Sequence, residues 1–215
     1  MRADRTKPDG ERLFEIAESQ QGYFTASQAV QNGFARSTHT YHVQSGNWVR
    51  EHRGIYRLRR FPLSPEGQLV LWSLWSRDRR GVPQGVYSHL TAFSIKELSD
   101  ANPSKLHMTV PPHFRRTSDK PPILVLHKAR LSPGEVLHEF GYSVTTPIRA
   151  VMDVAASGDA GRDLIQQALA EGRSRGLITE RQIADALARA DLDPWLLDAF
   201  RNQPPSSWTH LSPSY

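Results

Sequence analysis

The side chains in this sequence that are best suited to bind a ligand are arginines gathered between residues 36 and 60. This stretch holds six arginines and one acidic residue, Glu51. Guanidinium groups form charge-assisted hydrogen bonds with phosphate oxygens, so such a cluster is typical of a surface that binds a nucleic acid. The alternative is an incidental basic hairpin on a small polar domain. Binding of a polyanion explains the pattern better than a chemical reaction does.

Polar residues between Arg36 and Arg50 indicate a helix that reads DNA bases. His39 and Val43 lie one turn apart and define its expected buried side. The opposite side then carries small polar groups suited to the major groove, where Gln44 could pair with adenine N6 and N7. Arginines on the following hairpin are expected to contact phosphates or the minor groove. The predicted DNA contacts are Arg36, Ser37, Thr38, Tyr41, His42, Gln44, Arg50, Arg53 and Arg57.

The usual signatures of catalysis are absent from the sequence, which contains no GxGxxG, P-loop, HExxH or GxSxG motif. We therefore expect no enzymatic activity, no catalytic residue, no cofactor and no metal site. His39 and His42 lie three residues apart but have no third ligand beside them in the sequence. Ser88 directly precedes His89, and we expect the two side chains to point apart on a helix that Ser88 caps.

Acidic residues in the last third of the chain bear on one enzymatic alternative, a metal-dependent nuclease in residues 65–200. Such an enzyme needs converging carboxylates, usually with a lysine nearby, and no lysine follows Lys128. We interpret these acidic residues as solvated helix faces: Asp153, Asp159, Asp163 and Glu171. A protein-interaction module whose N-terminal domain binds a partner protein is the third alternative.

The turn signals and hydrophobic periodicity of residues 10–60 predict a winged helix-turn-helix. The expected elements are helices over residues 11–20, 26–31 and 37–45 and strands over residues 48–52 and 55–58. Thr25 and Gln28 have the spacing of a capping box for the second helix, and Ser37 is the expected N-cap of the third. Helices followed by a hairpin in this order are typical of a winged reader of DNA.

The remaining residues predict a second domain over residues 65–200, after a short linker stiffened by prolines. Its expected strands cover residues 106–110, 123–127 and 140–144, and its C-terminal half is expected to be helical. The whole chain is therefore predicted to be an α/β (α+β) protein. Residues 201–215 are rich in Pro and Ser and are expected to form a flexible tail.

Composition limits the classes to which this 215-residue chain can belong. The sequence contains no cysteine, which excludes disulfides and Cys-based zinc or iron–sulfur sites. Residues 1–130 carry 20 Lys and Arg against 11 Asp and Glu, whereas residues 131–215 carry seven against 11. No apolar run approaches the ~20 residues that cross a membrane, and the N-terminus has no signal-peptide core. We expect a cytoplasmic protein without a membrane partner, basic at its N-terminal end.

Several stretches of the sequence resemble the AbiEi family of antitoxins. The N-terminal likeness lies in residues 22–29 and in residues 46–58, and the Arg-Gly-Ile-Tyr sequence of the hairpin is its most specific part. Residues 86–92 and 144–153 look like the second domain of that family. The similarity spans residues 10–190 and so covers most of the chain.

The resemblance implies a transcriptional repressor that is also the antitoxin of a type IV toxin–antitoxin system. In this family the winged domain binds inverted repeats upstream of its own operon and represses it. The second domain is associated with neutralising a nucleotidyltransferase-like toxin. We therefore expect double-stranded DNA as one partner and such a toxin as another.

Overall fold

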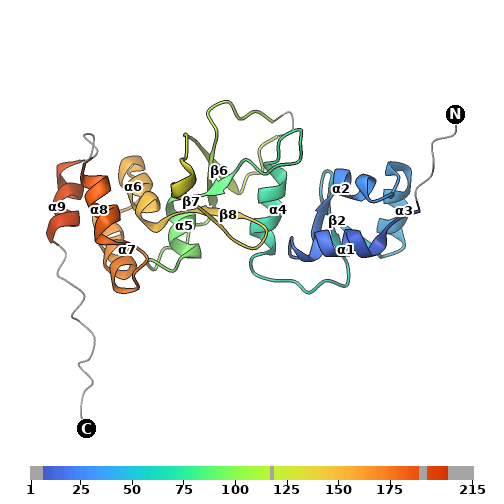
Figure 1. The fold of residues 1–215 in the computed structure, drawn as a ribbon, viewed down its shortest axis with the longest axis horizontal. Helices are drawn as coiled ribbons and strands as arrows, with labels where there is room; N and C mark the ends of the chain where they lie inside the picture. Colours follow the sequence, from blue (N-terminus) through green and yellow to red (C-terminus); the bar gives the residue numbers. More distant parts are fainter. Residues whose placement is uncertain (1–6, 117–118, 189–192, 203–215) are drawn as a thin grey trace, which may run out of the picture. The chain divides into compact units, whose positions relative to one another are not determined.

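The structure is a computed structural model that describes residues 7–116, 119–188 and 193–202. Contacts divide the chain into two compact units. The first comprises the residues up to 86 together with 138–143, and the second comprises residues 87–137 together with those from 144 onward. Helices and two small sheets make up the described residues, as Figure 1 shows. The predicted mixed α/β class is confirmed.

Short helices and strands alternate in the first unit. In chain order they are α1 (Gly10–Glu18), β1 (Tyr23–Thr25), α2 (Ala26–Gln31), a 3-10 turn (Arg36–Thr38), α3 (His39–Gln44), β2 (Trp48–His52), β3 (Ile55–Leu58) and α4 (Gly67–Trp75). The two hairpin strands have the bounds that the sequence predicts, and the first two helices differ from prediction by at most two residues at an end.

Local sequence signals explain where the first helices begin. Asp9 caps α1, because its carboxylate accepts a hydrogen bond from the backbone N–H of Arg12 at 2.9 Å. At α2 the Thr25 hydroxyl accepts a hydrogen bond from the Gln28 N–H at 3.2 Å. The Gln28 side chain in turn accepts one from the Thr25 N–H at 2.7 Å. The predicted capping box is therefore confirmed.

The strands β1, β3 and β2 form an antiparallel sheet in that order. One face of the sheet packs on α1, α2 and α3 around a core of Leu13, Ala17, Phe24, Ala29, Phe34 and Trp48. Because side chains alternate along a strand, Tyr23 lies on the face opposite to Phe24, and there it contacts Gly67 of α4. Helices in this order around a three-stranded sheet confirm the predicted winged helix-turn-helix.

The third helix begins differently from the prediction. Ser37 is not its N-cap, because residues Arg36–Thr38 form a separate 3-10 turn and α3 starts only at His39. The turn is closed by Thr38, whose backbone N–H and hydroxyl both donate to the carbonyl of Ala35, at 2.9 Å and 2.8 Å. The tight turn leaves the Ser37 side chain exposed to solvent.

A second sheet has the strand order β6-β5-β4-β8-β7. Its strands are β4 (Val86–Tyr87), β5 (Leu106–Val110), β6 (Leu124–Lys128), β7 (Val136–His138) and β8 (Ser143–Thr145). β5 and β6 are parallel, with His107 opposite Val125 and Thr109 opposite His127. The predicted third strand over residues 140–144 is shifted, because the chain turns at Gly141, whose φ is +91°, and β8 begins only at Ser143.

Helices and a 3-10 turn make up much of the rest of the second unit. They are α5 (His89–Ile95), a 3-10 turn (Pro133–Glu135), α6 (Pro147–Ser157), α7 (Arg162–Ser174), α8 (Glu180–Leu187) and α9 (Pro194–Asn202). Thr179 and Gln182 form the capping box of α8. The predicted helical C-terminal half is confirmed.

Two further predictions concern the ends of the second domain and membranes. Helix α9 runs to Asn202, so the first two residues of the predicted tail are helical, and residues 203–215 lie outside the described part of the chain. The two compact units place α4 in the first unit, whereas the domain boundary predicted near residue 65 stays a prediction. Among the described residues, no helix is both long and apolar enough to cross a lipid bilayer.

Candidate nucleic-acid interface

Two side chains on one side of α3 anchor this helix to the core. His39 is only 4% exposed, and its Nε2 lies 3.0 Å from the carbonyl oxygen of Phe34. Val43, one turn later, is half-buried and packs against the core cluster. The four-residue spacing of His39 and Val43 in the sequence predicts this buried side of the helix. With His39 and Val43 turned inward, Thr40, Tyr41 and Gln44 of the helix are left exposed to solvent.

The outward side of α3 and its preceding turn is polar and open. Tyr41 is 64% exposed. The other predicted contacts on this side are also exposed: Arg36, Ser37, Thr38 and Gln44. Thr40, which the prediction omits, is exposed as well and shares a helix face with Gln44 four residues later. The same spacing rule that identifies the buried side could have found Thr40.

The hairpin of β2 and β3 carries two exposed arginines. Arg50 lies two residues after Trp48, so both side chains belong to the sheet face on which α3 packs. Arg53 occupies the turn, where Gly54 has a φ of +70°. The Gly54 carbonyl accepts hydrogen bonds from the Ala26 N–H at 3.0 Å and from Arg77 at 3.3 Å. Arg53 therefore lies beside the start of α2, at the far end of β2 from Trp48.

Arg57 differs from the other predicted contacts. It is 9% exposed, and its Nε donates a hydrogen bond to Glu51 Oε1 at 2.8 Å. A second nitrogen of the same guanidinium donates to the carbonyls of Leu58 and Phe61. Arg57 is paired with Tyr23 across β3 and β1, which places it on the sheet face away from α3. We leave Arg57 out of the interface, because its hydrogen-bonding groups are already used inside the fold.

His42 also belongs to the packing of the domain. Its half-buried ring stacks on Trp48 with a centroid distance of 4.5 Å and an interplanar angle of 20°. Burial, and to a smaller extent the charge of neighbouring His39, lower the pKa of His42. Neutral pH therefore leaves this ring uncharged, which suits a ring stacked on indole and removes attraction to phosphate.

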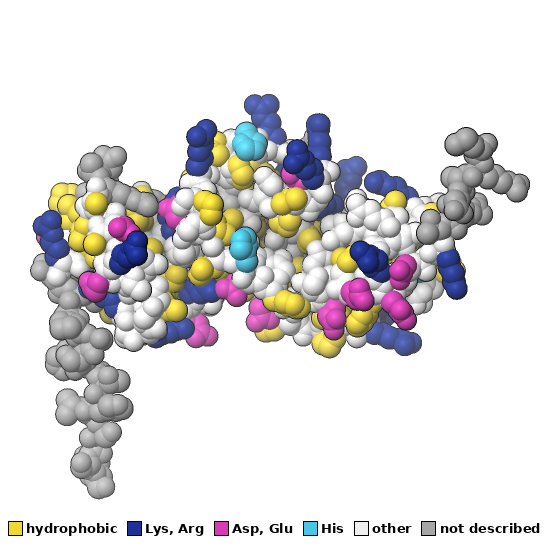
Figure 2. All heavy atoms as spheres, in the orientation of Figure 1, with side chains coloured by type: hydrophobic (Ala, Val, Ile, Leu, Met, Phe, Trp, Pro, Cys, Tyr) yellow, Lys and Arg dark blue, Asp and Glu magenta, His cyan; other side chains and the backbone are white. Residues whose placement is uncertain are grey.

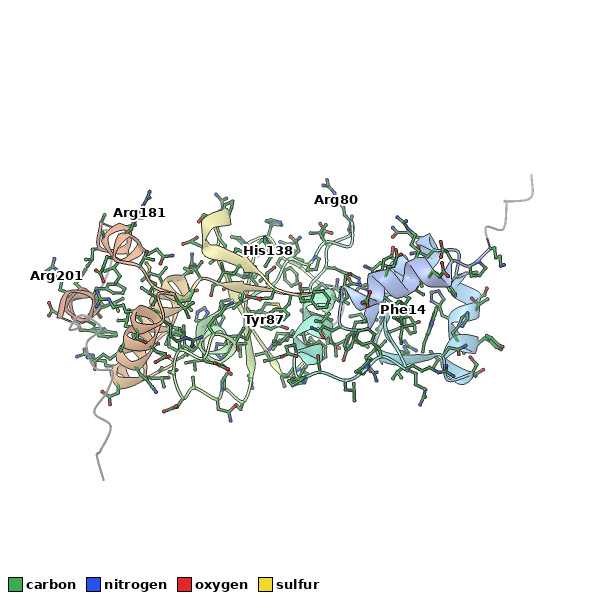
Figure 3. The ribbon with its side chains drawn as sticks, turned by 60° about the horizontal axis from the view of Figure 1, so that its bottom comes forward. Phe14, Arg80, Tyr87, His138, Arg181 and Arg201 are labelled. Atoms are coloured by element: carbon green, nitrogen blue, oxygen red, sulfur yellow. The ribbon has the colours of Figure 1, made fainter. Side chains whose placement is uncertain are left out.

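Acidic residues mark a different side of the first unit. The exposed side of α1 carries Glu11, Glu15 and Glu18, and Figure 2 shows acidic side chains gathered over this helix. Phe14, also on α1 and 48% exposed, is labelled in Figure 3. Carboxylates repel phosphate, so this side of α1 is unsuited to a polyanion.

A winged helix-turn-helix with an open polar third helix is an architecture used to read DNA. Residues 11–59 match the family described as transcriptional regulator, AbiEi antitoxin. This AbiEi match covers α1 to β3, so the resemblance is confirmed for the N-terminal part of the chain. AbiEi proteins are thus described as transcriptional regulators and antitoxins, and that description names no enzyme. No curated protein matches the chain.

The AbiEi match ends at residue 59. The likeness of residues 86–92 and 144–153 to the second AbiEi domain therefore stays a prediction, as does the contact of each predicted residue with DNA. The match identifies the fold of the residues that include α3. The exposed side chains of α3 indicate what that fold binds.

Two expectations for the second unit are wrong. Ser88 and His89 do not point apart, because Ser88 Oγ lies 2.9 Å from His89 Nδ1, and Ser88 makes no side-chain cap to α5. The reason is the backbone of His89, whose φ is +53°. Asp153 is not on a solvated face either, because Arg149 Nε donates to its carboxylate at 2.7 Å and the Asp153 side chain is 12% exposed.

Three histidines that are far apart in the sequence come together in the second unit. The ring of His89 stacks on that of His127 with a centroid distance of 3.6 Å, and the rings of His107 and His127 lie 5.2 Å apart. Burial lowers the pKa of all three, and that of His89 falls to about 3. No spacing in the sequence indicates this cluster, because separate strands and a helix supply its members.

Proposed function

We propose that this protein is a DNA-binding transcriptional repressor that acts as the antitoxin of a type IV toxin–antitoxin system. The open polar side of α3, held in place by His39 and Val43 within an AbiEi-like winged helix-turn-helix, carries the proposal. Residues 10–60 are the proposed DNA-binding domain, and residues 65–200 the proposed antitoxin domain.

Within this proposal, α3 reads bases in the major groove. Gln44 has a donor and an acceptor that match adenine N6 and N7, whereas Ser37 and Thr40 offer hydroxyls suited to phosphates or either class of base. The Thr38 hydroxyl donates to the Ala35 carbonyl, so it can only accept a hydrogen bond from a base. Tyr41, which is 64% exposed, is free to lie against the sugar–phosphate edge or a thymine methyl group.

Arginines supply the part of the affinity that does not depend on base sequence. Arg36 at the start of the 3-10 turn and Arg50 on β2 flank the α3 side, and Arg53 lies at the hairpin turn. Each phosphate that they neutralise releases condensed cations, so their contribution weakens as salt concentration rises. If two copies bind an inverted repeat, its half-sites are expected ~10 bp or a multiple of ~10 bp apart.

The test is footprinting of the full chain on the DNA upstream of its own operon, with a shuffled duplex of equal length as control. Protection of an inverted repeat at moderate salt, with weaker binding to the shuffled duplex, is the expected result. Equal binding to both duplexes would contradict repression through a specific operator. The same duplexes incubated with magnesium or manganese test the nuclease alternative, which predicts their cleavage.

The antitoxin part of the proposal has its own test. A nucleotidyltransferase-like reading frame beside the gene, expressed alone, is expected to arrest growth, and co-expression of this protein is expected to restore it. Arrest that persists at equal expression of both proteins would overturn the antitoxin role and leave the DNA-binding role to the footprint.

A further inference from the structure

We propose that His107, His127 and Asp159 form a binding site for one divalent transition-metal ion of the zinc type, with a coordination position left open to solvent. The site lies within the second unit and is independent of the DNA-binding role of α3. One ligand atom from each of the three residues lies within 4.8 Å of the other two.

Two parallel strands bring the histidines together. His107 on β5 lies opposite Val125 of β6, and His127 follows Val125 by two residues. Residues two apart on a strand share a face of the sheet, so both imidazoles lie on the same face as diagonal neighbours. Asp159 follows α6, which ends at Ser157 and is capped by Gly158 in the left-handed conformation with a φ of +69°. That turn carries the carboxylate toward the imidazoles.

The distance between the two histidines fits a shared ion. His107 Nδ1 and His127 Nε2 lie 3.1 Å apart. Zn–N bonds of about 2.0–2.1 Å in a tetrahedral site place two ligand nitrogens about 3.3–3.4 Å apart. Asp159 Oδ2 lies 4.0 Å from His107 Nδ1, and its side chain is 39% exposed, so a small rotation closes the remaining gap.

A hydrogen bond between the two neutral rings is the competing explanation of the 3.1 Å distance. A hydrogen bond between the two rings gives no role to Asp159. It also gives no role to the buried side chains that hold the rings in place. Thr109 Oγ1 donates to Ser88 Oγ at 2.7 Å, and Ser88 Oγ lies 2.9 Å from His89 Nδ1. The His89 ring then stacks on His127 at 3.6 Å and 15°.

This arrangement fixes the plane of the His127 ring. Ser88 is fully buried, Thr109 is 2% exposed, and Ser88 directly follows buried Tyr87 of β4, which is labelled in Figure 3. The positive φ of His89 is a conformation that residues with a Cβ seldom adopt. Locked ring orientation is what a metal site requires of its imidazole ligands.

The donor set selects the kind of ion. Two imidazole nitrogens and one carboxylate oxygen suit zinc, cobalt, nickel or iron, whereas magnesium and calcium prefer oxygen donors alone. Three protein ligands leave a four-coordinate ion with one further position. The exposed Asp159 places that position toward solvent, so water or a small anion is the expected fourth ligand.

Titration of the untagged full chain with Co²⁺, after treatment with a chelator, tests the proposal by visible absorption. We expect saturation at one equivalent, and displacement of Co²⁺ by Zn²⁺ but not by Mg²⁺. Asp159→Asn is expected to weaken binding at least by the ~10-fold that loss of even an outer partner of a metal ligand causes. His127→Ala is expected to abolish it, and His113→Ala, at an exposed histidine of the same unit, is the matched control.

Thermal unfolding of the same variants gives a second readout. Zinc is expected to raise the Tm of the wild-type protein and of His113→Ala, and to raise that of Asp159→Asn by less at the same zinc concentration. Because Asp159 lies on an exposed turn, this variant decides the matter even if His127→Ala fails to fold. Absence of saturable Co²⁺ absorption, or equal affinity in Asp159→Asn and His113→Ala, would overturn the site.

Discussion

Side chains of α3 and its hairpin divide by the direction in which they point. The rings of His39 and His42 contact Trp48, His42 also contacts Phe34, and Val43 packs on the core cluster, whereas Tyr41 and Gln44 face solvent. A substitution on the inner side should therefore lower stability, and one on the outer side should change only what the domain binds. This division gives each residue a measurable role.

Gln44→Ala is expected to reduce discrimination between the operator and a duplex with one changed base pair by ~1–3 kcal/mol, because a bidentate contact to adenine is lost. Competition binding with both duplexes measures it. Gln31→Ala, at an exposed glutamine of α2, is the matched control. Equal loss of affinity on specific and random duplexes would show that Gln44 does not read a base.

Arg50 and Arg57 are expected to behave differently although both are hairpin arginines. Arg50→Ala should weaken binding to every duplex and reduce the salt slope by about 1, without lowering the Tm. Arg57→Ala should instead lower the free energy of unfolding by about 1–3 kcal/mol, because it leaves Glu51 without its hydrogen-bond partner. An unchanged Tm for Arg57→Ala would contradict its structural role.

Glu135 makes stability depend on acidity. Burial raises its pKa, but hydrogen bonds from the Ser132 N–H and from Arg149 outweigh burial and hold the pKa at about 2, below its ordinary 4.5. The carboxylate therefore contributes stability above pH 4.5 that is lost as pH falls toward 2. Burial raises the pKa of neighbouring Asp153, which acts in the opposite sense.

Denaturant unfolding between pH 6 and pH 3 tests this dependence. Glu135→Gln is expected to be less stable than wild type at pH 6, and the difference should shrink as pH falls. Asp163→Asn, at an exposed carboxylate of α7, is the control. A constant difference across this range would show that Glu135 does not lose a stabilising charge there.

Capping residues determine where individual helices begin. The same capping box opens α2 in the first unit and α8 in the second, through Thr25 and Thr179. A capping box acts over four consecutive residues, so its effect on structure is readable from the sequence. What the helix then packs against is decided elsewhere in the chain.

Removal of each cap separates the two units experimentally. Thr25→Ala and Thr179→Ala should each cost about 1 kcal/mol of stability, because free N–H groups at the helix start lose their acceptor. Only Thr25→Ala is expected to weaken DNA binding, because Ala29 of α2 and Val43 of α3 pack on the same core cluster. Denaturant unfolding and footprinting of both variants measure this, and weaker footprints for Thr179→Ala would contradict the assignment of DNA binding to residues 10–60.

Charge is unevenly divided over the whole molecule. The first 130 residues carry an excess of nine basic over acidic side chains, 20 against 11, and the remainder carries an excess of four acidic ones, 11 against seven. Such a distribution steers a polyanion to the N-terminal end. The change from basic to acidic excess falls at residue 130, within the proposed antitoxin domain of residues 65–200.

Salt dependence of DNA binding tests this distribution for the full chain. With Arg36, Arg50 and Arg53 each neutralising one phosphate, a plot of log K against log salt should have a slope of about −3 per protein chain, at ~0.9 per phosphate. Affinity measured over a salt series gives the slope. A slope near zero would contradict the proposed phosphate contacts.

Local signals in the sequence determined much of the first unit. The capping box, the strands at residues 48–52 and 55–58 and the inward side of α3 follow from residues within a few positions of each other, which interact in almost any context. The start of α3 was mispredicted because a 3-10 turn and an α-helix share the same capping residues and differ only in the closing hydrogen bonds.

Only the tertiary structure decided which side chains from distant segments meet. Arg57 looks like its basic neighbours in sequence, but strand pairing turns it toward Glu51 and away from α3. His107, His127 and Asp159 converge because β5 pairs with β6 and because the chain turns at Gly158 after the end of α6. Contacts of this kind depend on the register of paired strands and on the packing of helices, which residues close in sequence do not encode.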